Sequence, residues 1–568
     1  MAKPGHAYPQ VEPGVAALMD SRVLRGAPAA TVARALARAR AAGATVVALG
    51  PGRAVRVSEL ARAAAWGLDR RSVGEVAWRD LPGVAAGASE IEARRHLRAG
   101  ASLVLVRRGA RVIGAVDRDR VAVTPPESSL LAQLEQTRPA VRRPPHLDIA
   151  RVWLLRVAGK IGEGLGTPAY AVGGFVRDLL AGAVPPDVDL VIEGDGVAFA
   201  RRLAEEIGGT VLVHRSFGTA SIEGGRAPAG AGVDGVALGR VDVASARREH
   251  YPMAGALPEV EPAPLLEDLG RRDFSVNAMA LALSPDRFGR LLDPLGGQAD
   301  VRRRRLRALH PLSFVEDPTR VFRAARYAGR LGLRPDTGTL AAIRLAVERP
   351  RYVALSGQRL WREIELAAAE PRARLVFERL VRWKAPSLWN LDRASGRHLA
   401  DAERFGRWAR SAGVAVDPAE LALLALMLGR PADEVERSLD RLALVGEPRA
   451  RLDAAALAAP LARQLEAARL RPSAVGERLE AAPAAAALAA WLRGGPRTRR
   501  RIQWYLAHGR AVRPRLTGRD LLAIGVPGGP RVGAALGMLR RHRLDGGAGS
   551  VAEERELVKE WLTSGKEA

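Results

Sequence analysis

The sequence has 568 residues, 48% of them hydrophobic, so it is long enough for about three or four domains and too apolar to be disordered throughout. It contains no cysteine, which excludes disulfides, thiolate zinc sites and cysteine nucleophiles, and no apolar run approaches the roughly 20 residues needed to cross a bilayer. The N-terminus also lacks the apolar core of a signal peptide, so we expect a soluble, cytoplasmic protein with no membrane partner.

The net charge of +26 is the first indication of a partner. A strongly basic surface attracts polyanions, and the release of counterions from nucleic-acid phosphates drives association. The charge therefore favours a nucleic acid as partner. A composition biased toward Ala, Arg and Gly is the alternative explanation, but such a bias does not by itself remove carboxylates.

Residues 15–125 contain one pattern twice. Each copy has a short lead-in, an Ala- and Arg-rich helix, a β-branched strand (at 45–49 and at 103–106), a turn with Gly, and another strand. This repeat resembles a tandem pair of CBS domains, an α/β fold that often binds adenosine nucleotides between its repeats. Where such pairs carry a ribose-binding Asp, the second copy has Arg120, with Asp119 one residue earlier. The pattern therefore leaves the CBS ligand open between an adenosine nucleotide and none.

Residues 126–150 are rich in Pro and polar residues and predict a linker. A new α/β pattern occupies 151–300. The chain then becomes almost wholly helical, first over 301–400 and then over 401–568. Three parts follow from this pattern: an α/β repeat pair, a second α/β domain and an all-α C-terminal region.

A Gly-Gly turn separates a short apolar strand from a helix in AYAVGGFVRDLLAG. Gly173 and Gly174 let the backbone pass close to a ligand, and free N–H groups at a helix start favour phosphate. Arg177, on the first turn of that helix, is positioned to pair with an anion. An ordinary turn is the alternative interpretation of this motif alone.

Asp187 and Asp189 are separated by one residue in PPDVDLVIEG, so both carboxylates project to the same side of a strand. Two such carboxylates repel each other unless a cation lies between them, and hard divalent ions suit oxygen ligands. A polar edge strand is the alternative, although the apolar continuation of the strand favours burial. Asp242 lies in a second β-like run. If that run lies beside the first, three carboxylates converge, as two-metal phosphoryl transfer requires.

Asp317 and Arg320 are three residues apart on a predicted helix and would share a face. Arg can donate to a base acceptor, while Asp accepts from an exocyclic amine. Cytosine and adenine both present that edge, whereas uracil and guanine present the reverse. The pair can therefore select C and A. An amphipathic helix with a solvated charged face is the alternative.

Five motifs in this order carry a specific resemblance: GGFVRD, DVD, RVDVASAR, LGRRDFSVNAMA and EDPTRVFRAARYAGRLG. Over residues 165–370 the chain resembles the class II family of tRNA nucleotidyltransferases and bacterial poly(A) polymerases. The resemblance implies a nucleotidyltransferase head with a mixed sheet over 151–300. It also implies a helical neck over 301–400, with the nucleotide-selecting EDxxR motif, and a helical, RNA-binding body and tail over 401–568.

The resemblance also implies roles for individual residues. Asp187 and Asp189 would hold Mg²⁺ in a two-metal site, and Asp242 would be the third catalytic carboxylate. The implied nucleotide-binding residues are Gly173, Gly174, Arg177, Arg272, Asp273, Asp317, Arg320, Arg323 and Arg326. Long members also carry an N-terminal phosphoesterase domain, which is absent from the sequence.

The expected activity is the template-independent transfer of AMP, with CMP as a second candidate, from ATP or CTP to the 3′ end of tRNA. The product is A addition or CCA addition, and poly(A) tailing of RNA is an alternative. An inactive RNA-binding protein with an adenosine-sensing CBS pair is the alternative of another class. The segment 244–268 occupies the place of a flexible loop found in members that add the final A, so CC-only addition is least expected.

Overall fold

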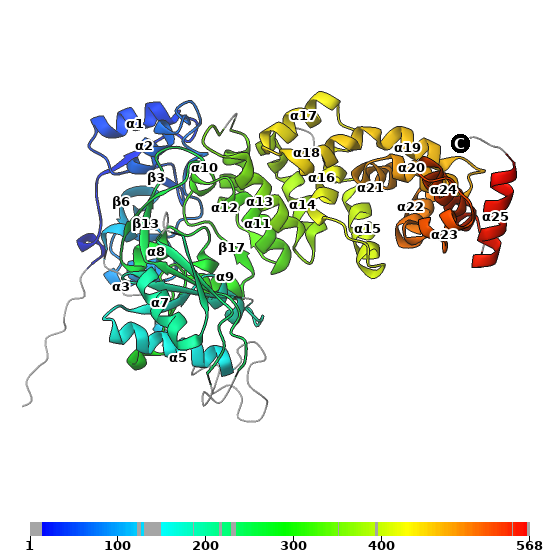
Figure 1. Ribbon diagram of the computed structural model, residues 1–568. Helices are drawn as coiled ribbons and strands as arrows, with labels where there is room; N and C mark the ends of the chain where they lie inside the picture. Colours follow the sequence, from blue (N-terminus) through cyan, green and yellow to red (C-terminus); the bar gives the residue numbers. More distant parts are fainter. Residues whose placement is uncertain are drawn as a thin grey trace, which may run out of the picture. The chain divides into compact units, whose positions relative to one another are not determined.

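The computed structural model describes residues 14–121, 127–129, 149–185, 187–214, 218–228, 235–349, 352–391, 396–547 and 549–564. The chain forms two compact units, Met1–Leu355 and Ser356–Ala568, which are described separately below (Figure 1). Within the described residues, no helix combines the length and the apolar character needed to span a membrane.

Two small sheets with the same strand order form the N-terminal part of the first unit. In each sheet the first two strands are parallel and the last two antiparallel. The first sheet consists of β1 (Val23–Arg25), β2 (Val46–Ala48) and β3 (Ala54–Arg56), and the second of β4 (Gly83–Ala85), β5 (Leu103–Arg108) and β6 (Arg111–Asp117). Their helices are α1 (Val32–Ala41), α2 (Val57–Ala65) and α3 (Glu90–Arg98). The internal repeat predicted from the sequence is therefore present as a repeated strand and helix order.

A mixed sheet follows, in which eight strands of the described residues pair in the order β10-β11-β12-β9-β8-β15-β16-β7. The strands are β7 (Glu127–Ser129), β8 (Ala169–Val172), β9 (Val188–Ile192), β10 (Thr210–His214), β11 (Thr219–Glu223), β12 (Val241–Ser245), β15 (Ala280–Ala282) and β16 (Arg290–Leu292). The pair β9–β12 is parallel, and its neighbours β8 and β11 pair antiparallel to it. The mixed sheet expected from the resemblance is thus confirmed.

The predicted linker, 126–150, is only partly described and needs a correction. Residues 127–129 form β7, which pairs antiparallel with β16 and so extends the sheet of the following domain. Helix α5 (Ile149–Gly164) begins before the predicted end of the linker. Polar and Pro-rich composition does not exclude a short edge strand, because an edge strand needs a partner on one side only. Residues 130–148 lie outside the described part of the chain.

Two helices, α5 and α7 (Gly196–Ile207), pack against each other and against the mixed sheet (Figure 1). Helix α7 begins where Asp195 caps it, accepting hydrogen bonds from the N–H groups of Val197 and Ala198, and it ends at Gly208 with a φ of 67°. Its apolar stripe, which includes Phe199 and Leu203, is fully buried. These contacts fix the strands that carry the acidic residues.

The segment 244–268, expected as a loop, contains ordered elements. Strands β13 (Arg247–His250) and β14 (Glu259–Pro262) form an antiparallel hairpin, and α8 (Leu265–Gly270) follows. Glycine and proline between the strands supplied the loop-like composition, but the alternating Arg-Arg-Glu-His run can pair as a strand. The segment is therefore a hairpin with a connecting turn.

The first unit ends in short helices around two small strands. They are α9 (Gly297–Arg302), β17 (Arg305–Leu306), α10 (Ser313–Glu316), α11 (Arg320–Arg330), β18 (Arg334–Pro335) and α12 (Thr337–Val347). Earlier in this unit, the helix α6 (Gly174–Leu180) follows β8. Helix α11 buries Val321, Phe322 and Ala325 on its apolar face.

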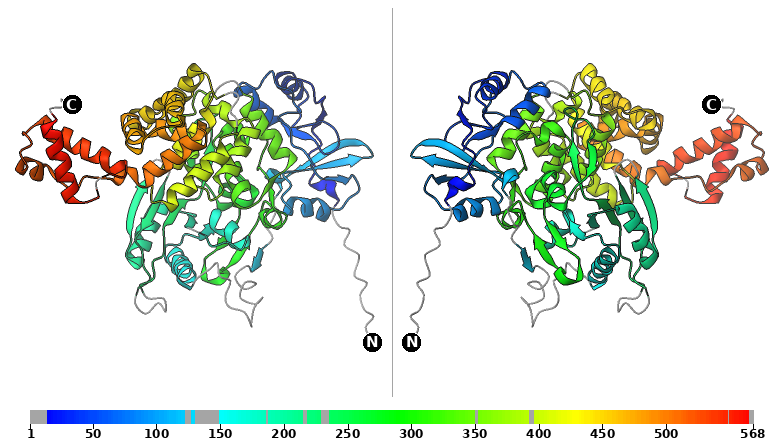
Figure 2. Two further views of the ribbon diagram at one scale, coloured as in Figure 1. Left: turned by 90° about the vertical axis from the view of Figure 1, so that its right-hand side faces the viewer. Right: turned by 90° about the vertical axis from the view of Figure 1, so that its left-hand side faces the viewer.

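The second unit is helical throughout its described residues. Its α-helices are α13 (Gly357–Ala368), α14 (Ala373–Arg382), α15 (Leu399–Ser411), α16 (Pro418–Met427), α17 (Ala432–Arg441), α18 (Gly446–Asp453), α19 (Ala458–Glu466), α20 (Pro472–Ala481), α21 (Ala484–Arg493), α22 (Pro496–Ala507), α23 (Gly518–Ala523), α24 (Pro530–Leu544) and α25 (Val551–Thr563). Helix α16 is apolar on all sides and buried, as a central core helix is. Figure 2 shows α23, α24 and α25 packed together (red), around a core that includes Leu521, Leu539 and Val558.

Candidate active site

Asp189 and Asp242 are direct partners across the parallel strands β9 and β12. Paired residues of neighbouring strands project to the same face of a sheet, so the two carboxylates share one face. Asp187 lies one residue before β9 and is exposed. The structure therefore confirms that the two strands with acidic residues lie side by side, although Asp187 precedes its strand.

The surroundings of Asp189 disfavour the negative charge of its own carboxylate. The pKa of Asp189 is raised to about 6. Burial is the main cause, the charges of Asp242 and Asp187 add to it, and Arg272 and Arg177 oppose it. A carboxylate that is buried beside like charges is costly until a cation neutralises it. Asp189 is thus held in a position where a bound cation would be favourable.

Asp242 is oriented by neighbours from the same sheet. Its Oδ1 accepts a hydrogen bond of 2.6 Å from the hydroxyl of Ser221 and one of 2.9 Å from Nε of Arg240. Within the described residues, no three His, Asp or Glu side chains form a group that could hold a metal ion. The predicted convergence is therefore seen in part. Asp189 and Asp242 are register partners, and Asp187, just before β9, is close enough for its charge to act on Asp189.

The Gly-Gly turn lies directly beside Asp189. Gly173 has a φ of 64°, and a Cβ placed on it would lie 2.9 Å from Nη1 of Arg272, so a larger residue would be strained and would clash. A Cβ on Gly174 would lie 3.6 Å from Oδ2 of Asp189. The two glycines thus bring the backbone close to the carboxylate pair and to Arg272, whose Nη2 donates to Asp268 over 2.9 Å.

A buried polar chain connects this turn to α11. Nη1 of Arg177 donates to Asn277 over 2.7 Å, and the amide of Asn277 donates to Asp273 over 2.8 Å. Nε of Arg323 completes the chain by donating to Asp273 over 2.7 Å. Burial by itself raises the pKa of Asp273, but Arg323 and Asn277 outweigh it and lower the pKa below its ordinary value. Asp273 is thus a buried, ionised bridge between two arginines.

Arg177 is nearly inaccessible in this arrangement. It also pairs with Asp178 over 2.7 Å, and its guanidinium lies 4.7 Å from the ring centre of Tyr327. Its position next to Gly174 agrees with the sequence expectation. Its contact with the phosphates of a nucleotide stays a prediction. So does contact with the nucleotide for Arg272, Asp273, Arg323 and the half-buried Arg326 on α11.

The expectation that Asp317 and Arg320 share one helix is wrong. Asp317 is the C-cap residue after α10, with extended backbone angles (φ −133°, ψ 99°), and Arg320 is the first residue of α11. Pro318 follows Asp317 directly, and a residue before proline avoids helical angles. The two residues instead flank a tight turn, in which Oδ1 of Asp317 accepts hydrogen bonds from the N–H and the hydroxyl of Thr319.

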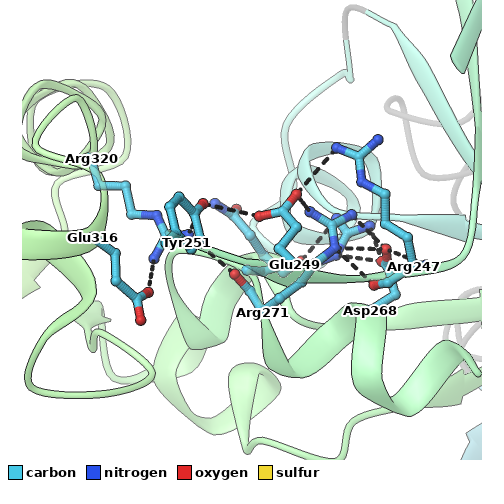
Figure 3. Close-up of polar contacts among 9 residues, drawn as sticks. Arg247, Glu249, Tyr251, Asp268, Arg271, Glu316 and Arg320 are labelled. Atoms are coloured by element: carbon cyan, nitrogen blue, oxygen red, sulfur yellow. Dashed lines mark hydrogen bonds and ion pairs between the residues drawn. The ribbon is translucent and has the colours of Figure 1, made fainter. Parts of the chain in front are cut away.

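Arg320 is buried, and its guanidinium is held from several sides (Figure 3). Nη1 donates to the hydroxyl of Ser313 over 2.7 Å, and Nη2 donates to the hydroxyl of Tyr251 over 3.1 Å. Nη1 also lies 3.6 Å from Oε2 of Glu316. Tyr251 in turn donates to Glu249 over 3.0 Å, and Nη1 of Arg271 donates to the same Glu249 over 2.5 Å.

Sequence reasoning missed Glu316 and Tyr251 as members of this site. Glu316 precedes Asp317 in the EDxxR motif, and this position is the sequence signal that could have identified it. Tyr251 lies far from the motif in the sequence and carries no spacing signal. Its link to Arg320 exists because the hairpin β13–β14 places the residue after β13 beside α11.

A cavity of about 670 Å³ lies between the N-terminal repeats and the rest of the first unit. Its wall includes Arg62 and Trp78 from the first repeat, Asp119 from the second, and Tyr251 and Glu316 from the following domain. The cavity therefore adjoins the turn that carries Asp317. It lies within a single compact unit.

Residues 169–307 match the Poly A polymerase head domain family. An A-adding tRNA nucleotidyltransferase from Geobacter sulfurreducens is 34% identical over 434 residues, which cover 73% of this chain and 47% of the relative. A CC-adding tRNA nucleotidyltransferase from Deinococcus radiodurans is 34% identical over 420 residues, covering 74% of this chain and 95% of the relative. The chain thus spans about half of the Geobacter relative and nearly all of the Deinococcus relative.

Among solved structures, the CCA-adding enzyme of Thermotoga maritima in complex with tRNA is similar over most of its length. The TM-score is 0.61, the sequence identity is 25%, and the match covers 77% of this chain and 99% of that enzyme. The similarity therefore extends from the head into the helical region.

Proposed function

The chain belongs to the tRNA nucleotidyltransferase family, and from this premise we propose that it adds nucleotides to the 3′ end of tRNA without a template. The proposal rests on the register pair of Asp189 and Asp242 beside the Gly173–Gly174 turn. A carboxylate pair next to a close backbone approach suits a bound nucleoside triphosphate.

In the proposed reaction, the 3′-oxygen of the RNA forms a bond to the α-phosphorus of ATP. The bond from that phosphorus to the bridging oxygen of the β-phosphate breaks, pyrophosphate leaves, and the hydroxyl proton passes to water. Arg272 lies beside Gly173 and Asp189, so its guanidinium is placed to neutralise a phosphate there. The buried chain from Arg177 to Arg323 keeps the turn and α11 in a fixed relation.

Carboxylate oxygens are ligands that suit a hard divalent cation. Asp187 and Asp189 would hold Mg²⁺ with Asp242 beside them, since the raised pKa of Asp189 reflects burial and repulsion that a cation relieves. When bound, such ions lower the pKa of the attacking hydroxyl and neutralise charge on the triphosphate.

For nucleotide selection, we propose that Asp317 and Arg320 read the base edge from the turn between α10 and α11. The half-buried Asp317 offers an acceptor for the exocyclic amine of adenine or cytosine. Arg320 is fixed by Ser313, Tyr251 and the carbonyl of Arg271, so its guanidinium has a defined direction. Preorganised donors and acceptors discriminate better than mobile ones.

Among the products, we favour addition of the final A over complete CCA synthesis, and both over poly(A) tailing. The relatives include both an A-adding and a CC-adding enzyme, so their similarity does not choose between products. The hairpin over 244–268 occupies the place of the loop that A addition requires, and its Tyr251 contacts Arg320. An architecture with a preceding repeat pair also resembles members that add only A.

We also propose that residues 15–125 are a tandem CBS pair, supported by the repeated strand order. Asp119, near the ribose-binding position of such pairs, lies 3.5 Å from Arg56, which also pairs with Glu59 over 3.1 Å. This ion pairing favours a structural role over nucleotide binding. For the helical second unit we propose tRNA binding, supported by exposed arginines such as Arg497 and Arg500 on α22.

Primer extension tests the function and the product together. The substrates are tRNAs ending at the discriminator base, at C and at CC, each incubated with Mg²⁺ and one nucleotide at a time. We expect ATP incorporation on the CC-ending tRNA alone. Efficient CTP incorporation on the first two substrates would establish CCA addition instead, long A ladders on unstructured RNA would indicate tailing, and no transfer on any substrate would reject the function.

A further inference from the structure

An ion pair links the N-terminal repeats to the EDxxR turn. Nη1 of Arg62, on α2 of the first repeat, lies 3.1 Å from Oε1 of Glu316, and the side chains are 46% and 6% exposed. Glu316 immediately precedes Asp317 and ends α10. A residue of the repeats therefore contacts the carboxylate next to the proposed base-reading residue (Figure 3 shows Glu316 beside Arg320).

The two oxygens of Glu316 have different partners. Oε2 accepts from Nε2 of His310 over 2.9 Å and lies 3.6 Å from Nη1 of Arg320. Oε1 faces Arg62. Burial by itself raises the pKa of Glu316, but His310, Arg320 and Arg62 lower it below its ordinary value, so the carboxylate is ionised.

Loss of Arg62 would leave Oε1 of a buried carboxylate without this donor. A buried charge that loses one partner moves toward those that remain, because an unsatisfied charge in a low dielectric is costly. The nearby donors are His310 and Arg320, both on the Oε2 side. The expected response is a rotation of Glu316 that disturbs the guanidinium of Arg320, which also receives support from Ser313 and Tyr251.

We propose that Arg62 is a positioning residue through which the N-terminal repeats set the nucleotide selectivity of the EDxxR turn. This inference rests on the proposed function, since it assigns a specificity role at the same site. Arg62 is well placed for it because α2 is anchored by the fully buried Leu60 and Ala63. Because α2 is held in place by the repeats, the position of the repeats determines where Arg62 meets Glu316.

The repeats are also joined to the head and neck at points that do not involve Glu316. Nη2 of Arg71 donates to Glu348 over 3.0 Å, and Nη1 of Arg307 donates to the carbonyl of Gly100 over 3.1 Å. Removal of Arg62 should therefore leave the repeats docked. Arg71 offers a matched control, since it forms an ion pair across the same junction with Glu348 in place of Glu316.

The test compares Arg62→Gln, Arg62→Lys and Arg71→Gln with wild type on tRNA ending in CC. The readouts are kcat/KM for ATP, CTP and GTP, and the thermal midpoint of each variant. We expect Arg62→Gln to lower the ATP-over-GTP ratio about two- to five-fold, as loss of a partly exposed ion pair allows. The ATP-over-CTP ratio should stay near the wild-type value, since adenine and cytosine present the same edge. Arg62→Lys should recover part of the ratio, and Arg71→Gln should keep the wild-type ratio.

Equal ratios in Arg62→Gln and Arg71→Gln would overturn the inference, as would a loss in Arg62→Gln that is uniform for all three nucleotides. If Arg62→Gln fails to fold, unchanged ratios in the folded Arg62→Lys, whose shorter side chain cannot reproduce the guanidinium contact, would overturn it equally. Wild-type protein without any transfer would instead reject the proposed function, so the two failures are distinguishable.

Discussion

Asp189 on β9 and Asp242 on β12 are register partners in the one parallel pairing of the mixed sheet among the described residues. Their shared face and the burial of Asp189 place two like charges where a cation would be favourable. The pairing places the two carboxylates together by backbone geometry, independently of side-chain rotamers.

Substitution of Asp189 or Asp187 by Ala should abolish nucleotide transfer and leave the protein folded. Each change removes a proposed metal ligand, and Asp189→Ala also removes a buried charge beside like charges, so the thermal midpoint should stay equal or rise. Transfer is measured with labelled ATP on CC-ending tRNA. Glu205→Ala, at an exposed position of α7, is the control that keeps full activity. Turnover above a few per cent of wild type in either Asp variant would contradict the metal assignment.

Substitution of Asp317 by Ala should relax nucleotide selection more than it slows transfer. The lost acceptor for the exocyclic amine should reduce the preference for ATP over GTP or UTP about tenfold, which corresponds to the low end of one base-edge contact. Competition assays with mixed nucleotides measure this ratio.

Asp317 also accepts hydrogen bonds from Thr319, so a loosened turn could produce the same loss. Thr319→Ala removes the hydroxyl contact and keeps the carboxylate, and it should retain selectivity. Unchanged ratios in Asp317→Ala, with all four nucleotides slowed equally, would show that the residue does not read the base.

The acidic strands illustrate what the sequence predicts well. Asp189 and Asp242 each lie in a β-branched, apolar run, and such a run predicts a buried strand with a fixed side-chain alternation. Their adjacency is a condition of the sequence-based prediction, and the register of β9 and β12 confirms it. The metal-binding role of these residues stays a prediction.

The environment of Arg320 illustrates what the sequence cannot predict. The proline after Asp317 is visible and should have broken the predicted helix at that residue. The contacts of Arg320 with Tyr251 and of Glu316 with Arg62 are long-range, and no periodicity encodes them. They depend on how the hairpin and the repeats pack against α10 and α11, which is a tertiary property.

The fully buried Asp268 should contribute stability that depends on pH. Burial by itself raises its pKa, but Arg272 and Arg271 outweigh burial and lower the pKa below its ordinary value. A lowered folded-state pKa gives stability that is present above the unfolded pKa, near 4, and is lost as the pH falls through the folded pKa. Asp268→Asn should therefore cost about 3 kcal/mol at pH 7, the cost of breaking a buried ion pair, and progressively less below about pH 4.

Urea denaturation at pH 7 and at the lowest pH where wild type stays folded measures this difference. Asp69→Asn, at an exposed carboxylate, should change little at either pH. A destabilisation by Asp268→Asn that is the same at both pH values would indicate a loss of packing and not of an ion pair.

Tyr251→Phe should weaken nucleotide binding through Arg320. The hydroxyl of Tyr251 accepts from Nη2 of Arg320 and donates to Glu249, so its removal leaves both groups with one partner fewer. We expect the KM for ATP to rise about three- to ten-fold, with a smaller change in kcat, since one hydrogen bond to a charged group contributes about 1 kcal/mol or somewhat more. Steady-state kinetics on CC-ending tRNA gives both constants.

Tyr170→Phe, which removes a hydrogen bond of 3.1 Å to Glu193 elsewhere in the head, is the matched control and should keep the wild-type KM. A KM that rises equally in both variants would mean that the head has loosened generally, and an unchanged KM in Tyr251→Phe would mean that Ser313 and Glu316 suffice to hold Arg320.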